Sequence, residues 1–121
     1  MPILVIYGMS KIEEMSPLQG LPTELAEAVE AIGELGLTND QVSVFIPSDC
    51  VENGLGEELV CIVEGLFSKP ERTPEVRKKL AEVVCEVLSS FACKHIPRCR
   101  KVEVFVKQFN QDKDGFVSWL R

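Results

Sequence analysis

The chain has 121 residues, of which 45% are hydrophobic, and it carries a formal net charge of -6. This length and composition predict one domain with its own core, and the acidic balance argues against a nucleic-acid-binding surface. No apolar run reaches the roughly 20 residues that span a bilayer, and the first residues lack the pattern of a secretory signal. The five cysteines are an odd count without the spacing of a disulfide framework, so we expect a reducing, cytoplasmic location.

The first half of the chain is predicted to form a strand, a helix and a second strand. Residues 3–7 are a short apolar run rich in β-branched side chains, which is typical of a buried strand. Residues 22–35 keep their apolar positions on one face, which predicts a helix with Gly36 as its C-terminal cap. A second strand is expected over residues 42–46, followed by a loop over residues 48–57.

The second half repeats this order. Residues 59–67 form a strand pattern that is apolar at nearly every position except Glu64. Thr73 and Pro74 are typical of a helix cap and a first-turn proline, and they begin a second helix. Alternation predicts a strand over residues 102–109, and a turn then leads to a short last strand at residues 116–119. The second helix carries one apolar stripe, made by Val76, Leu80, Val83, Val84, Val87, Leu88 and Phe91.

Two β-α-β units in one chain predict an α/β (α+β) fold with a four-stranded mixed sheet and two helices on one face. The single domain would have pseudo-repeat halves at residues 1–57 and 58–121. Strands 3–7 and 59–67 are apolar on both faces, so two helices would leave several hundred Å² of apolar sheet in water, more than a soluble monomer usually shows. Burying even ~800 Å² contributes about 20 kcal/mol before association costs. We therefore expect an obligate oligomer.

Pro2 follows the initiator methionine directly and opens the first strand. A proline also suits the first residue of a strand for purely structural reasons. The initiator methionine is usually removed before a small residue, and its removal here leaves a secondary amine that can act as a general base. If Met1 stays attached, the proline nitrogen is an amide and cannot act in this way.

The chain resembles the tautomerase superfamily, which includes 4-oxalocrotonate tautomerase, 5-carboxymethyl-2-hydroxymuconate isomerase, the chloroacrylic acid dehalogenases and macrophage migration inhibitory factor. The resemblance covers essentially the whole chain and combines the amino-terminal proline with the doubled β-α-β unit. Its stretches are Pro2-Ile3-Leu4-Val5-Ile6, residues 53–58, residues 64–73 and residues 102–119.

The resemblance implies a cofactor-free enzyme in which the amine of Pro2 moves a proton beside a carbonyl. Arg72 matches a family arginine that binds the substrate carboxylate, and Lys69 matches a second cation of the dehalogenase-like pattern. Glu103 and Phe105 match fourth-strand positions that point into the family pocket. The implied substrates are small carboxylated keto-enol acids of the 2-oxo acid type. The implied assembly is a homotrimer, and the charge and hydropathy of the chain predict no nucleic-acid or membrane partner.

Electrostatics supports these roles independently. Arg72 precedes a helix N-terminus, where an anion is favoured, and its planar fork can hold a carboxylate in two hydrogen bonds. A nearby cation and partial burial both lower the pKa of an amine from its ordinary value near 8, and a fall of one to two units needs about 1.4 to 2.7 kcal/mol. The Pro2 amine would then be largely a free base at pH 7.

Two other functions stay open. One is a hydratase or dehalogenase of unsaturated acids, which needs a water-activating carboxylate such as Glu103 beside Pro2. The other is a non-catalytic trimeric binding protein, which retained Met1 would favour. The second strand has Ser43 where some tautomerases carry an arginine, and Glu103 and Phe105 replace a Tyr/Asn pair of the cytokine-like members. The native substrate therefore does not transfer from any relative.

Two short patterns resemble metal sites without completing one. Residues 110–115 open like a calcium loop, but position twelve would be Arg121 rather than glutamate, so a turn is expected. Cys93, His95 and Cys99 have odd spacing for zinc. We expect no metal.

Overall fold

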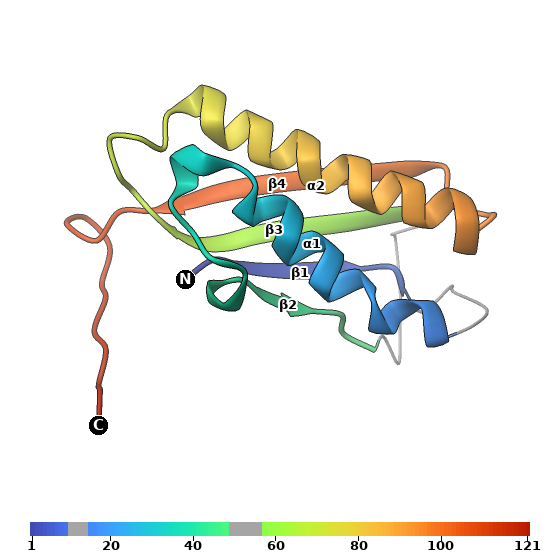
Figure 1. The fold of residues 1–121 in the computed structure, drawn as a ribbon, viewed down its shortest axis with the longest axis horizontal. Coiled ribbons are helices and arrows are strands. Elements are labelled where there is room, and N and C mark those ends of the chain that lie inside the picture. The colour runs from blue at the N-terminus through green and yellow to red at the C-terminus, as the bar shows by residue number, and fades with distance from the viewer. Residues whose placement is uncertain (10–14, 49–56) are drawn as a thin grey trace.

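One mixed sheet with two helices on one face forms the body of the protein (Figure 1). The computed structural model describes residues 1–9, 15–48 and 57–121. The strands are β1 (Ile3–Tyr7), β2 (Ser43–Phe45), β3 (Glu58–Phe67) and β4 (Lys101–Phe109). The helices are α1 (Leu21–Glu30) and α2 (Pro74–His95), with short 3-10 turns η2 (Ser16–Gln19), η3 (Gly33–Leu35) and η4 (Asn39–Gln41).

The strand order across the sheet is β2-β1-β3-β4. β1 runs parallel to β2, β3 runs parallel to β4, and the two pairs meet through the antiparallel contact of β1 with β3. Each parallel pair is connected through a helix, α1 in the first half and α2 in the second. The predicted pair of β-α-β units, with both helices over one face, is therefore confirmed.

The core lies between the sheet and the helices because alternate strand residues face the same side. On β1, and on β3 up to Val63, every second residue is buried. Val102, Val104 and Val106 of β4 pack against the same cluster. The helices close the cluster with one stripe each. The buried members are Leu4, Ile6, Leu25, Val29, Leu59, Cys61, Val63, Leu66, Leu80, Val84, Leu88 and Phe91.

The ends of the two helices follow from local chemistry. Thr73 caps α2 as predicted, since its hydroxyl accepts a hydrogen bond from the Val76 N–H at 3.3 Å. The first helix ends at Glu30 and not at residue 35. The backbone of Ile32 is extended, so the helix is broken there and η3 follows as a separate turn. The side chains of both Ile32 and Leu35 are buried. Gly36 has the predicted capping role, at φ +64°, but it caps η3.

The predicted last strand at residues 116–119 was wrong. The chain turns after β4, where the side-chain oxygen of Asn110 accepts from the Asp112 and Lys113 N–H groups, and then runs away from the sheet (Figure 1). A strand needs a neighbouring strand for its hydrogen bonds, and this segment pairs with none in the described residues. Trp119 is 77% exposed; only Phe116 packs back, with its ring 4.9 Å from that of Phe67.

The sheet face opposite the helices carries an apolar row. Phe45, Val5, Ile62 and Phe105 lie side by side across all four strands. Phe45 is 57% exposed and Phe105 is 54% exposed, so this open face shows large apolar side chains to water, as the sequence predicted. No helix in the described part of the chain is long and apolar enough to cross a membrane.

Candidate functional site around residues 1 and 2

Pro2 is buried at the entrance to β1. Its carbonyl oxygen accepts a hydrogen bond from the Ser43 N–H at 3.1 Å, so the β1–β2 pairing fixes its position. Met1 precedes it and is 61% exposed, with its sulfur 3.8 Å from the Ser43 hydroxyl. Ser43, which stands where some tautomerases have an arginine, therefore lies directly beside the amino terminus. With Met1 attached, the Pro2 nitrogen is an amide.

A β-bulge in β3 brings backbone against residue 1. Val63 pairs with Val106 and Leu66 pairs with Gln108, so two residues of β3, Glu64 and Gly65, oppose a single residue of β4. Gly65 has φ +73°, and a Cβ added to it would lie 2.8 Å from the carbonyl oxygen of Met1. Only glycine fits this conformation and this approach.

The amino terminus lies in a positive environment. Burial is the main cause that lowers the pKa of the Met1 amine from its ordinary value, and the charges of Arg72 and Lys69 lower it further. The two cations expected from the sequence are thus brought to the amino-terminal end of β1, where they favour the uncharged form of an amine. Lys69 is exposed.

Arg72 is held more firmly than the sequence indicated. The residue is only 5% exposed, and its terminal nitrogens donate hydrogen bonds to the carbonyl oxygens of Phe67 at 2.7 Å and Leu35 at 2.8 Å. Burial lowers the pKa of its guanidinium, which the charge of Glu71 partly opposes. Arg72 therefore joins the end of β3 to η3, and its positive charge is fixed beneath the amino terminus.

The turn from Ser68 to Arg72 contains unpaired polar atoms. Ser68 Oγ and Arg72 Nε are the buried side-chain nitrogen or oxygen atoms without a hydrogen-bond partner in the part of the chain that the structure describes. Buried polar groups are nearly always paired in folded proteins, so this turn keeps hydrogen-bonding capacity that the described residues do not use.

A hollow of about 290 Å³ opens beside the bulge, lined by Ile3, Glu64, Gly65, Lys107, Gln108 and Phe109. Glu64 stands directly opposite Ile3 in the β1–β3 register, so its carboxylate belongs to the same end of the sheet as Pro2. Sequence reasoning did not select Glu64. The available signal was a charge followed by a glycine inside an otherwise apolar strand, a pattern typical of a bulge.

Glu103 and Phe105 lie elsewhere in a single chain. Glu103 is opposite Val60, which pairs with Tyr7 at the far end of β1, roughly 16 Å along the strand from Pro2. Its carboxylate forms an ion pair with Lys101 at 3.2 Å. Phe105 belongs to the apolar row of the open face. The structure does not bring either side chain to the Pro2 of its own chain.

Among the described residues, the other chemically active groups do not gather into a second centre of this kind. Within residues 1–9, 15–48 and 57–121, no group of three or more His, Cys, Asp or Glu side chains is arranged to hold a metal ion. Burial raises the pKa of the Cys61 thiol to about 12, which makes it a poor nucleophile.

Comparison with known proteins gives matches among solved structures. No family model matches the sequence, and no curated protein matches it. The F6 fused 4-OT, solved as an asymmetric trimer, is similar at a TM-score of 0.65 and 17% identity, covering 94% of this chain and 91% of that one. A 5-carboxymethyl-2-hydroxymuconate delta-isomerase is similar at a TM-score of 0.65 and 13% identity, covering 100% of this chain and 87% of that one.

A third solved structure broadens the chemistry found on this architecture. Malonate semialdehyde decarboxylase, with decarboxylase and hydratase activities, is similar at a TM-score of 0.52 and 13% identity, covering 98% of this chain and 91% of that one. At these identities the matches show the fold: the chain has the tautomerase-type β-α-β architecture over its full length.

Proposed function

We propose that the chain is a cofactor-independent tautomerase of small carboxylated keto-enol acids, in which the amine of Pro2 acts as general base and acid after Met1 is removed. The observation that carries this proposal is the position of the amino terminus, at the bulge of β3 and beside Lys69 and Arg72. The fold shared with tautomerases and isomerases supports it.

The proposed reaction moves one proton within the substrate. The uncharged Pro2 amine takes the proton from the enol hydroxyl of a 2-oxo acid in its enol form, and the resulting enolate is stabilised by the nearby positive charges. The protonated amine then returns the proton to the adjacent carbon, which gives the keto form and regenerates the free base. No other co-reactant is needed.

The two cations have different parts in this proposal. Lys69 is exposed and free to contact the substrate carboxylate. Arg72 is buried and already donates two hydrogen bonds to backbone carbonyls, so it acts mainly through its fixed charge. Both charges also keep the Pro2 amine deprotonated near neutral pH.

The proposed assembly is a homotrimer in the cytoplasm. The open face, with its row from Phe45 to Phe105, needs a cover, and the F6 fused 4-OT of the same fold is a trimer. A neighbouring copy can also bring its own Glu103 or Phe105 toward Pro2, which is the pocket-lining role proposed for them. The described cysteines are free thiols, which fits a reducing compartment.

Hydration of an unsaturated acid is the second candidate. It requires a carboxylate that activates water beside Pro2, and within one chain this position belongs to Glu64, which lines the hollow next to Gly65. Glu64→Gln separates the two reactions: it should abolish hydration of an acetylenic acid, while tautomerisation, which does not use Glu64, continues.

The deciding experiment measures ketonisation of phenylenolpyruvate by the purified protein, together with its intact mass. Pro2→Ala should lower kcat/KM by about 10²-fold or more, because removing a positioned base costs this much. Alanine at position 2 also permits removal of Met1, so the amino termini stay comparable. Pro47→Ala, a change outside the site, serves as the control and should keep full activity.

Unchanged kinetics in Pro2→Ala would reject the proposed mechanism. A mature protein that retains Met1 and has no activity would favour the non-catalytic binding protein.

A further inference from the structure

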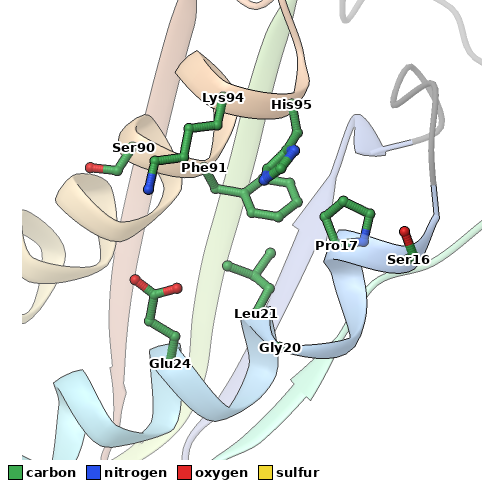
Figure 2. Close-up of a pocket in the computed structure, with 9 residues that line it drawn as sticks. All are labelled: Ser16, Pro17, Gly20, Leu21, Glu24, Ser90, Phe91, Lys94 and His95. Atoms are coloured by element: carbon green, nitrogen blue, oxygen red, sulfur yellow. The ribbon is translucent and has the colours of Figure 1, made fainter.

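A second cavity lies between the start of α1 and the end of α2 (Figure 2). Its volume is about 430 Å³, within the range of small-molecule sites. It is far from Pro2: Arg72 precedes α2, whereas Lys94 and His95 form the last turn of this 22-residue helix, roughly 30 Å away. The cavity is also on the helix side of the sheet, so an oligomer formed through the open face would leave it accessible.

The floor of the cavity is apolar and well ordered by packing. Leu21 is 1% exposed and Phe91 is 7% exposed, so both belong to the protein core and only their outermost atoms line the cavity. The His95 ring packs beside Phe91 with the ring centres 4.8 Å apart. This floor suits an apolar side chain, and best a ring, because aromatic surfaces pack on one another at such distances.

The walls of the cavity carry opposite charges. Glu24 projects from α1 and Lys94 from α2, and both line the cavity (Figure 2). Neither takes part in an ion pair within the described residues, where the pairs are Arg100–Glu57 and Lys101–Glu103. A ligand with a single charge would be attracted by one wall and repelled by the other. A ligand with both charges satisfies both walls.

We propose that this cavity binds a small zwitterion with an apolar side chain, of the chemical class of the aromatic α-amino acids. The ammonium group pairs with Glu24, the carboxylate pairs with Lys94, and the side chain lies on Leu21 and Phe91. The site is separate from Pro2, so this binding does not depend on the proposed catalysis.

Gly20 offers a clean way to close the cavity. It lines the cavity, its backbone is in the right-handed region (φ -88°), and an added Cβ would meet no atom within 4 Å. Gly20→Leu therefore adds a large side chain at the lining of the cavity without backbone strain. Gly33 also has no atom within 4 Å of an added Cβ and lies outside the cavity, so Gly33→Leu is the matched control.

The test is a calorimetric titration of the full chain with L-phenylalanine, 3-phenylpropionate and 2-phenylethylamine. The zwitterion should bind in the millimolar range or tighter, and each singly charged compound should bind about fivefold more weakly, as expected for loss of one exposed charge pair. Gly20→Leu should abolish binding, and Gly33→Leu should retain it. Lys94→Met should weaken L-phenylalanine binding about fivefold and should strengthen 2-phenylethylamine binding, because the repulsion between the two cations is removed. This opposite response remains decisive if Gly20→Leu fails to fold.

Three results would overturn the proposal. The first is that L-phenylalanine shows no saturable binding at concentrations about 10-fold above the millimolar range. The second is that all three compounds bind equally well. The third is that L-phenylalanine still binds to Gly20→Leu as it does to the wild type.

Discussion

The close approach of Gly65 to Met1 allows the state of the amino terminus to be read from stability. Gly65 and Gly36 both have positive φ, +73° and +64°, but an added Cβ meets the Met1 carbonyl oxygen at 2.8 Å only at Gly65. Alanine in this backbone region costs ~1–2 kcal/mol, and the lower entropy of the unfolded chain returns ~0.4–1 kcal/mol. Gly36→Ala should therefore lose about 1 kcal/mol of unfolding free energy.

Gly65→Ala carries an additional cost when Met1 is present. The methyl group forces two backbone segments apart by several tenths of an ångström, and overpacking of this kind costs ~1–3 kcal/mol. We expect a total loss of about 2–4 kcal/mol in protein produced with methionine aminopeptidase inhibited, and about 1 kcal/mol in protein without Met1, where the contacting carbonyl is gone. Urea denaturation of both variants in both forms measures this. Equal losses for Gly65→Ala and Gly36→Ala in the Met1-containing form would refute the reasoning.

Three further predictions address the cations and the open face. Arg72→Met removes both hydrogen bonds to the carbonyl oxygens of Phe67 and Leu35. It should lower the free energy of unfolding by ~2–4 kcal/mol, which corresponds to a fall in Tm of about 10 °C. A change below ~0.5 kcal/mol would contradict the structural role of Arg72. Burial, Arg72 and Lys69 lower the pKa of the Met1 amine, and we expect the same surroundings to lower the pKa of the Pro2 amine once Met1 is removed, so activity should rise with pH as that amine loses its proton. Lys69→Met removes one of the charges that lower this pKa, so the midpoint of the pH–activity curve should move upward, though only partly because burial is the largest cause. Lys94→Met, at the far end of α2, should leave the midpoint in place, and an unmoved midpoint in Lys69→Met would reject the assignment. Phe105→Asp places a charge in the apolar row of the open face and should dissociate the oligomer in analytical ultracentrifugation, whereas Lys78→Asp on α2 should not. A wild-type protein that is monomeric at micromolar concentration would contradict the expected trimer.

Most of the fold could be predicted because the local patterns and the tertiary contacts agree. The period-2 and 3.6-residue apolar patterns identified all four strands of the sheet and both helices, and the order of elements fixed the parallel pairs. The two misjudged regions depend on contacts beyond the local pattern. The helix pattern over residues 22–35 continues past Glu30, but the break at Ile32 buries two side chains that a straight helix would place differently. Residues 116–119 have the composition of a strand and lack a neighbouring strand within the described chain.

The positions of the candidate residues could be predicted where neighbours in the sequence decide them, whereas their roles stay predictions. Lys69 and Arg72 fall in the turn between β3 and α2, and the pairing of β1 with β3 places that turn beside Pro2. The burial of Arg72 could not be read from the sequence, since one of its acceptors, Leu35 O, comes from 37 residues earlier. The position of Glu64 depends on the register of β3 with β4, which sets the bulge.

The most direct measurement is an ¹⁵N NMR pH titration of the Pro2 nitrogen in mature protein labelled with [¹⁵N]proline, in the folded state and in urea. The account predicts a mass without Met1, a titrating secondary amine, and a pKa in the folded protein clearly below that of the same group in urea. A nitrogen still acylated by Met1, or one pKa shared by both states, would contradict it.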